Sequence, residues 1–372
     1  MNTLAAVLAN PASAVDLGNA QWEQLLGELR RARMLARLDA VLRAHCEEEL
    51  LPLAARELMR SDAIYVANVQ RAARQELGRL SSIAREVDYP VILLKGSAYL
   101  AAGLPVAQGR RQSDLDVLVP ASALDDFEQR LRREGWHFAA DLSAYDEHYY
   151  REWAHELPPM RHSRSVIELD VHHSLIQRTS RVQLDIASIV EAARPLPDTP
   201  FHVLCDEDLI LHSALHLVMS DELRGGIRDL YDIHCLCVDF LGDDVVAWER
   251  LIGRARAVGL LRPLYYALLA ARNLFALRPP ITAWQVLCAG GKPGVLADSV
   301  MRRLMRWHFA PVAGQQARAA TARQMLYLRS HWIRMPPAML VRHLVNKCVV
   351  TLCDARSSKG ASDDPQKLPR ME

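Results

Sequence analysis

Two aspartates separated by one residue, Asp114 and Asp116, are the residues whose types and spacing point most directly to chemistry. They fall in the segment 114–119, which has the aliphatic alternation of a strand. Side chains alternate between the two faces of a strand, so both carboxylates point one way while Leu115 and Val117 point the other. Carboxylates this close raise each other's pKa unless a cation lies between them. The pair favours a site for Mg²⁺, which prefers oxygen ligands and is often completed by substrate phosphates.

A segment just upstream supplies groups that suit a phosphate. The aliphatic run 91–94 predicts a buried strand, and Lys95, Gly96 and Ser97 follow it where a short helix is expected to begin. A glycine permits a sharp turn at this point. Amide groups at the start of a helix donate hydrogen bonds to phosphates. The sequence therefore predicts that a triphosphate contacts the turn at Gly96 and Ser97.

A third segment, residues 165–172, has the clearest strand alternation in the sequence. Its polar face carries Glu168, Asp170 and His172. A site that holds two metal ions needs a further carboxylate for one of the ions, in addition to two that bridge both. Glu168 and Asp170 are both candidates for this third carboxylate. His172 could contact a phosphate or orient a carboxylate, and a packing role is an equal alternative.

Together, these segments resemble the nucleotidyltransferase superfamily that includes DNA polymerase beta and the minimal nucleotidyltransferases. The motif residues are Leu94-Lys95-Gly96, then Gly109-x-Arg111-x-Ser113-Asp114-x-Asp116, then Leu169-Asp170-x-His172. This pattern is similar to that of a bacterial branch of uncharacterised nucleotidyltransferases. The likeness covers roughly residues 90–240. The segment between Ser97 and Asp114 is longer than is usual in the superfamily, and we interpret it as a helix followed by an arginine-bearing loop.

The resemblance implies a fold class and a set of site residues. The fold would be α+β, with a small mixed β-sheet nucleotidyltransferase core and helical N-terminal and C-terminal regions. Asp114, Asp116 and Asp170 would be the catalytic residues and would hold two Mg²⁺ ions, with Mn²⁺ as the alternative metal. The resemblance favours Asp170 over Glu168 as the third carboxylate. The implied nucleotide-binding residues are Lys95, Gly96, Ser97, Arg111, Ser113 and His172.

The function that the resemblance implies is metal-dependent transfer of a nucleoside monophosphate. The donor would be a nucleoside triphosphate, the acceptor an unknown hydroxyl-bearing molecule, and the by-product pyrophosphate. Two alternatives stay open: a non-catalytic module that binds a nucleotide or a protein, and a toxin-like tRNA nucleotidyltransferase. The three carboxylates, all present, weigh against the first alternative. The formal net charge of +1 disfavours a broad surface for nucleic acid and therefore the second.

Composition and helical patterns predict the organisation of the chain. Half of the 372 residues are hydrophobic, which is ample for a core. We expect a helical region over 1–88, the catalytic domain over 89–200, a helical domain over 201–355 and a disordered tail over 356–372. Seven cysteines lack the paired spacing of a zinc site, and the sequence shows neither a membrane span nor a signal peptide. These features predict a cytoplasmic protein with reduced thiols.

Two pairs of residues in the expected C-terminal helices carry weaker signals. His212 and His216 are four residues apart, a spacing that can bind zinc, but no third ligand lies nearby in the sequence. We interpret them as packing residues. Arg228 and Asp232 could face the nucleotide base or the acceptor, although solvated helix charges are the preferred interpretation.

Overall fold

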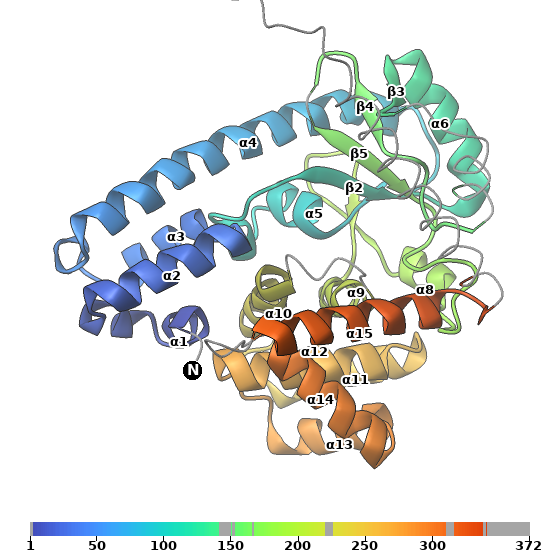
Figure 1. The fold of residues 1–372 in the computed structure, drawn as a ribbon. Helices are drawn as coiled ribbons and strands as arrows, with labels where there is room; N and C mark the ends of the chain where they lie inside the picture. The colour runs from blue at the N-terminus through green and yellow to red at the C-terminus, as the bar shows by residue number, and fades with distance from the viewer. Residues whose placement is uncertain are drawn as a thin grey trace, which may run out of the picture.

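The structure, a computed structural model, describes residues 3–140, 150, 153–165, 167–219, 226–309, 316–337 and 340. These residues form a mixed fold in which one seven-stranded sheet is flanked by helical N-terminal and C-terminal regions (Figure 1). The predicted α+β fold class is therefore confirmed. The predicted domain boundaries stay predictions, and the tail over 356–372 lies outside the described residues.

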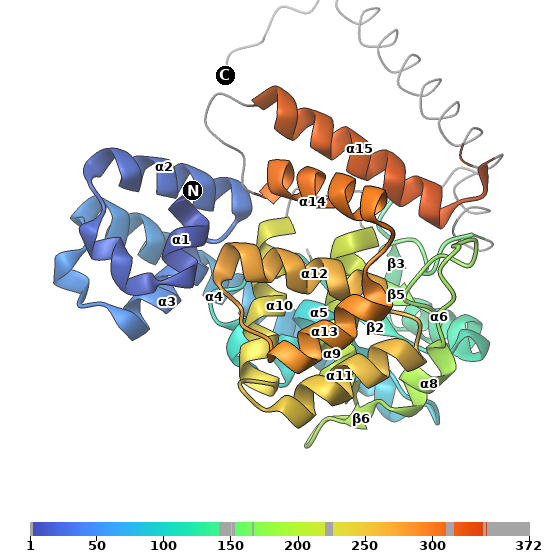
Figure 2. The same cartoon turned by 90° about the horizontal axis from the view of Figure 1, so that it is seen from below.

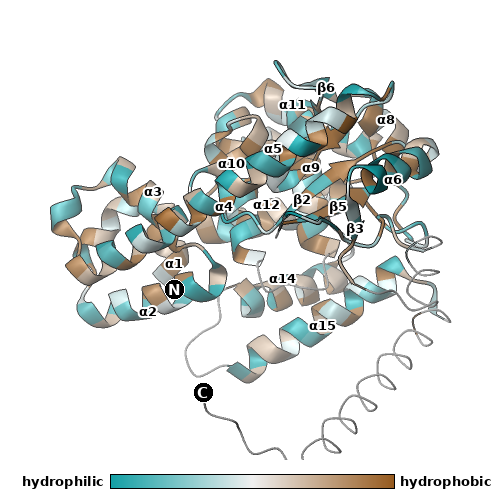
Figure 3. Ribbon diagram, turned by 90° about the horizontal axis from the view of Figure 1, so that it is seen from above, coloured by the Kyte–Doolittle hydropathy of each residue, from teal (hydrophilic) through white to brown (hydrophobic). Residues whose placement is uncertain are grey.

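The N-terminal region is helical, as predicted for residues 1–88. Its helices are α1 (Thr3–Ala9), α2 (Asn19–Ala32), α3 (Leu35–His45) and α4 (Leu53–Arg85), with 3-10 turns η1 (Pro11–Asp16) and η2 (Glu48–Leu50). The long helix α4 runs from this helical group to the sheet and contacts both α3 and α5 (Figure 1). Both polar and apolar residues occur along these helices (Figure 3), as expected when one face packs on a core and the other meets water.

The sheet has the order β3-β4-β5-β2-β1-β7-β6 and mixes parallel with antiparallel pairs. Its strands are β1 (Ile92–Leu93), β2 (Asp114–Leu118), β3 (Trp136–Phe138), β4 (Met160–His162), β5 (Glu168–His172), β6 (Arg194–Pro195) and β7 (His202–Val203). The pairs β2/β5 and β1/β7 are parallel, and the other pairs are antiparallel. The three strands that carry the predicted motifs, β1, β2 and β5, are neighbours at the centre of the sheet.

Alternation along the central strands produces one apolar and one polar face. Leu115 and Val117 of β2, like Leu169 and Val171 of β5, are fully buried in the core. Burying each such side chain contributes roughly 1.5–3 kcal/mol to stability, so the register that buries all four is strongly preferred. That same register leaves the intervening acidic residues on the opposite face.

Short helices connect the central strands. They are α5 (Lys95–Ala101), η3 (Pro105–Ala107), η4 (Ala121–Ala123) and α6 (Leu124–Arg133). The predicted helix and arginine-bearing loop between Ser97 and Asp114 are confirmed by α5 and the loop that follows η3. Gly135, the second residue after α6, has a φ of +90°, the left-handed conformation that commonly follows the end of a helix.

The chain is mainly helical after β5, and the helices beyond the sheet pack together below it (Figures 1 and 2). They are α8 (Ile186–Glu191), α9 (Asp206–Met219), α10 (Gly226–Phe240), α11 (Val245–Ala257), α12 (Leu261–Phe275), α13 (Ile281–Gly291), α14 (Val295–Phe309) and α15 (Gln316–Arg334). Helix α9 contacts α10, α12 and α5, and so joins this group to the helix that follows β1. Within the described ranges, no helix combines the length and apolar character needed to cross a bilayer.

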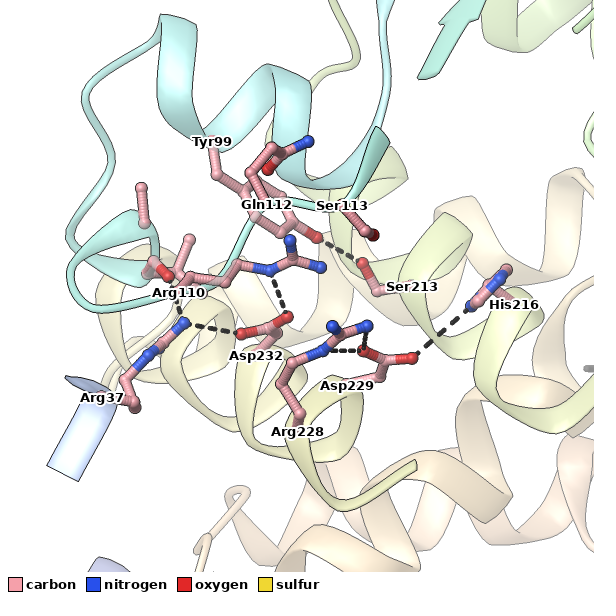
Figure 4. Close-up of polar contacts among 12 residues, drawn as sticks. Arg37, Tyr99, Arg110, Gln112, Ser113, Ser213, His216, Arg228, Asp229 and Asp232 are labelled. Carbon is pink, nitrogen blue, oxygen red and sulfur yellow. Dashed lines mark hydrogen bonds and ion pairs between the residues drawn. The ribbon is translucent and has the colours of Figure 1, made fainter. Parts of the chain in front are cut away.

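A buried carboxylate on α10 links three parts of the chain (Figure 4). Asp232 is 2% exposed, and its two oxygens accept hydrogen bonds from Arg37 of α3 at 3.0 Å and from Arg110 at 2.8 Å. Arg37 also donates to the carbonyl of Val106 at 2.6 Å. The interpretation of Asp232 as a solvated helix charge is therefore wrong. The contact fixes the N-terminal helices against the loop that precedes β2.

We expect Asp232→Asn to lower the free energy of unfolding by about 3–5 kcal/mol, because it leaves two buried guanidinium groups without their common anion. Urea unfolding followed by circular dichroism measures this loss. Asp239→Asn is the matched control, since Asp239 lies on the same helix and is exposed. The control should change stability by no more than about 0.5 kcal/mol. Equal effects of the two substitutions would contradict the structural role of Asp232.

Candidate functional site

The predicted carboxylates lie on two adjacent parallel strands. Asp116 of β2 is the direct cross-strand partner of Asp170 of β5, and Asp114 is the partner of Glu168. Facing residues of paired strands project to the same side of a sheet. The structure therefore brings Asp114, Asp116 and Asp170 together, although their assignment as metal ligands stays a prediction.

Glu168 lies on the same face but has a partner of its own. Its carboxylate accepts a hydrogen bond from Arg161 of β4, the residue that faces it across the β4/β5 pairing. This contact offsets the charge of Glu168 and directs it toward the neighbouring strand. Of the two candidates for a third carboxylate, Asp170 therefore has the less compensated charge.

The acidic groups at this site outnumber the cations that compensate them. Burial, together with the charges of Asp116 and Glu156, raises the pKa of Asp170 to about 8. Burial and Asp116 also raise the pKa of Asp114. Of the three predicted ligands Asp114, Asp116 and Asp170, Asp116 alone has a pKa below its usual range. Lys95 and His172 stabilise its charged form by more than burial destabilises it. A face with carboxylate oxygens and surplus negative charge fits a divalent cation.

Lys95 lies at the junction of β1 and α5 and contacts the centre of the site. Its Nζ lies 3.6 Å from Asp116 Oδ1, and its side chain is 17% exposed. Although burial lowers the pKa of Lys95, Asp116 and Asp114 raise it above its ordinary value, so the amine is charged. The backbone of Lys95 has a φ of +43°, a conformation that costs a non-glycine residue about 1–3 kcal/mol. Lys95 therefore lies beside the carboxylates, and its contact with a nucleotide stays a prediction.

The role predicted for Gly96 in turning the chain is wrong, because the positive φ belongs to Lys95 and not to Gly96. Gly96 is needed for a different reason. A Cβ at this position would collide with the side chains of Arg110 and Gln112. The absence of a side chain at Gly96 thus allows Arg110 to lie against the start of α5.

Ser97 makes contacts that differ from the phosphate contact predicted for it. Its side chain is fully buried, and its Oγ accepts a hydrogen bond from the backbone amide of Asp116 at 2.9 Å. Its own amide donates to the carbonyl of Leu94 at 3.0 Å. These contacts fix the position of Asp116 relative to α5. A contact between Ser97 and a phosphate stays a prediction.

The two adjacent arginines of the loop before β2 point to different places. Arg111 donates to the hydroxyl of Tyr65 on α4 at 2.9 Å and stacks 4.7 Å from the centre of that ring. Arg110, which the sequence did not single out, lines the cavity beside the carboxylates. A loop has no periodicity from which to choose between adjacent residues. Ser113 donates to Asp114 Oδ1 at 2.9 Å and so helps to hold that carboxylate.

A small polar cavity of about 80 Å³ opens between Asp114 and Asp116 on one side and the helices α9 and α10 on the other. Its lining includes Lys95, Gly96, Arg110, Asp114, Asp116, His216, Arg228 and Asp229. Asp229 pairs with Arg228 at 2.8 Å and lies 3.9 Å from His216. Neither Asp229 nor His216 was predicted to belong to the site, since both lie on helices whose charged faces resemble ordinary solvated ones. A larger cavity of about 880 Å³, among α9, α12, α14 and α15, contains none of the predicted site residues.

His172 connects the carboxylates to a second group of polar residues. Its Nε2 lies 3.2 Å from Asp116 Oδ1, and its Nδ1 lies 3.2 Å from Glu156 Oε2. Glu156 reaches this position because it forms an isolated bridge with His172 beside β5. Within the described part of the chain, His155, Glu156 and His172 are the group of three or more ligand-type residues close enough to share a metal ion. By contrast, His212 is 4% exposed, in agreement with its predicted packing role.

A comparison with protein families shows to which family the chain belongs. A family described as uncharacterised nucleotidyltransferase matches residues 18–276. The chain belongs to this family. The match includes the three central strands, the N-terminal helices from α2 onward and the C-terminal helices as far as α12. The family membership that the motifs predicted is thus confirmed. A search of curated proteins found no match to the chain.

The raised pKa of Asp170 predicts that the protein, without added metal ions, loses stability as the pH rises. Between the ordinary pKa of 3.8 and the folded-state value of about 8, the folded protein keeps a proton that the unfolded chain has released. Stability therefore falls with pH in this window, by up to about 1.4 kcal/mol per pH unit. Urea unfolding in the presence of a chelator at pH 5.5, 6.5 and 7.5 measures the slope.

Asp170→Asn serves as the matched comparison because an amide does not titrate. Its stability should decrease less than that of the wild-type protein over the same pH range. Added Mg²⁺ should stabilise the wild-type protein more than the variant at pH 7.5, because the ion favours the ionised carboxylate. If the free energy of unfolding of the two proteins changed equally with pH, the raised pKa of Asp170 would be contradicted.

Proposed function

We propose that this nucleotidyltransferase transfers a nucleoside monophosphate from a nucleoside triphosphate to an acceptor hydroxyl, with release of pyrophosphate. The observation that carries the proposal is the in-register parallel pairing of Asp116 with Asp170, beside Asp114 on the same face. Carboxylates from two adjacent strands can share a pair of ions, as a two-metal displacement requires.

The metal would be held by Asp114, Asp116 and Asp170, whose oxygen donors and surplus negative charge suit Mg²⁺, with Mn²⁺ as the alternative. When bound, such ions lower the pKa of the acceptor hydroxyl and neutralise charge on the departing pyrophosphate.

The positive side chains that line the cavity are suited to the triphosphate. Lys95 reaches it from the start of α5, Arg110 from the loop before β2 and Arg228 from α10. Because the cavity measures only about 80 Å³, it admits phosphate oxygens but not a whole nucleotide. The base and ribose would therefore extend outward from the carboxylates. Ser97, Arg111, Ser113 and His172 remain predicted nucleotide-binding residues, with the contacts described above.

The reaction would proceed by in-line attack at the α-phosphate. The acceptor oxygen forms a new bond to phosphorus while the bond to the bridging oxygen of the pyrophosphate breaks, and that oxygen leaves with the electron pair. Asp170 would accept the proton of the acceptor hydroxyl. No other residue is then required as a general base.

A non-catalytic nucleotide-binding or protein-binding role is the main alternative. A fold that had lost catalysis would have no need to keep three like charges close together in a partly buried site, because such an arrangement is costly without a cation. The juxtaposition of the three carboxylates therefore favours the enzyme. The acceptor could be a small molecule, a glycan or a tRNA, and the net charge disfavours the last.

Incubation with labelled nucleoside triphosphates, Mg²⁺ and a cell extract as the acceptor source tests the proposal. We expect pyrophosphate release and label transfer that fall at least about a hundredfold in Asp116→Asn and in Asp170→Asn, because each removes a charge that acts in the transition state. Glu168→Gln is the control and should retain most of the activity, since Glu168 pairs with Arg161.

Nucleotide binding without turnover in the wild-type protein would favour the non-catalytic alternative. Label that appears in tRNA would identify the toxin-like alternative. Equal losses in Glu168→Gln and Asp170→Asn would show that the third carboxylate has been assigned wrongly.

A further inference from the structure

A group of nitrogen and oxygen donors lies one step along β5 from the carboxylates. It consists of His155, Glu156 and His172, whose donor atoms all lie within 4.8 Å of one another. His155 and Glu156 have no part in the proposed transfer reaction, and the donor atoms of the group differ from those of the transfer site. The transfer site offers carboxylate oxygens alone, whereas this group combines two imidazoles with one carboxylate.

Distances within the group are close to those of a tetrahedral metal site. Glu156 Oε2 lies 3.2 Å from His172 Nδ1 and 3.7 Å from His155 Nε2. Metal bonds of about 2.0–2.1 Å arranged tetrahedrally place ligand atoms about 3.3 Å apart. The donors therefore need only small side-chain movements to bind one ion. Imidazole ligands suit zinc and related transition metals, whereas Mg²⁺ prefers oxygen.

The backbone holds these residues in place independently of any ligand. Glu156 bridges to His172, and the amide of Leu157 donates to the carbonyl of Val171 at 2.8 Å. The amide of His173 donates to the carbonyl of His155 at 2.9 Å. A site fixed by strand-like pairing loses little conformational entropy when it binds an ion.

A second, independent observation points to a ligand at this position. The Nδ1 atoms of His155 and His172 are both buried; within the described residues the first has no hydrogen-bond partner, and the second faces only the carboxylate of Glu156 at 3.2 Å. A buried polar atom without such a partner is uncommon in native proteins.

Asp116 completes the arrangement on the far side of His172. Its Oδ1 lies 3.2 Å from Nε2, the ring nitrogen that does not face Glu156. A histidine that binds a metal through one nitrogen usually donates its other N–H to a carboxylate, which fixes the tautomer and the orientation of the ring. Asp116 is placed to accept such a hydrogen bond from Nε2 of His172.

We propose that His155, Glu156 and His172 bind one zinc-type transition-metal ion, at a site separate from the carboxylates that would hold Mg²⁺. Three protein ligands leave a fourth position for water or a substrate oxygen. The ion fixes His172 so that its Nε2–H donates to Asp116. It also ties the segment around His155 and Glu156 to the end of β5. In this arrangement His172 is a positioning residue for Asp116.

Titration of the full-length, metal-free protein with Co²⁺ tests this site, because four-coordinate cobalt gives intense visible absorption bands that six-coordinate cobalt does not. We expect one equivalent of Co²⁺ to produce these bands and one equivalent of Zn²⁺ to remove them. His155→Ala and Glu156→Gln should each weaken the apparent Co²⁺ affinity at least about tenfold. Circular dichroism checks that both variants keep the fold.

Asp114→Asn is the control that separates this site from the proposed transfer site. It should abolish nucleotidyl transfer and leave the cobalt bands unchanged. Loss of the bands in Asp114→Asn would place the ion among the transfer carboxylates and overturn the proposal. The proposal would also be overturned if the bands persisted in both His155→Ala and Glu156→Gln, or if the wild-type protein gave only the weak spectrum of six-coordinate cobalt.

Discussion

The parallel pairing of β2 with β5 is the constraint on which the site depends. Burial of the aliphatic residues on one face of these strands determines the register, and the register places Asp116 opposite Asp170 on the other face. The free energy that holds the acidic residues together therefore comes from the hydrophobic core beneath them. Their mutual repulsion is overcome by the fold, and a bound cation would relieve it.

Contacts behind the strands determine where each charged group points. Ser97 accepts the amide of Asp116, Lys95 adopts a costly backbone conformation at the start of α5, and Gly96 leaves room for Arg110. Each of these residues acts on the position of a charge at the site. The short sequence Lys95-Gly96-Ser97 is therefore important for geometry, whether or not all three residues contact a phosphate.

The sequence predicted the central strands well because alternation along a buried strand is a strong signal. Asp114, Asp116 and Asp170 followed from this alternation and from the family resemblance. The prediction failed where tertiary contacts decide. The identity of the arginine that faces the cavity depends on the path of an irregular loop.

Charged residues on helices were the second kind of failure. The position of Asp232 in the helical pattern is that of an exposed residue. In the folded chain it is buried and pairs with Arg37, which lies 195 positions away in the sequence. Glu156 joins the site through a single bridge beside β5, which no local pattern reveals. Long-range ion pairs and isolated bridges depend on the assembled fold, and so one sequence does not disclose them.

The contact between Arg37 and Asp232 also bears on how much of the chain is needed for a self-sufficient fold. Helix α3 lies more than forty residues before the first strand, yet it supplies one of the two cations that Asp232 needs. A shortened protein that began at β1 would keep every proposed ligand and lose this partner. The sheet is therefore not a portable module, and the family match, which begins at residue 18, already spans the helix that anchors it.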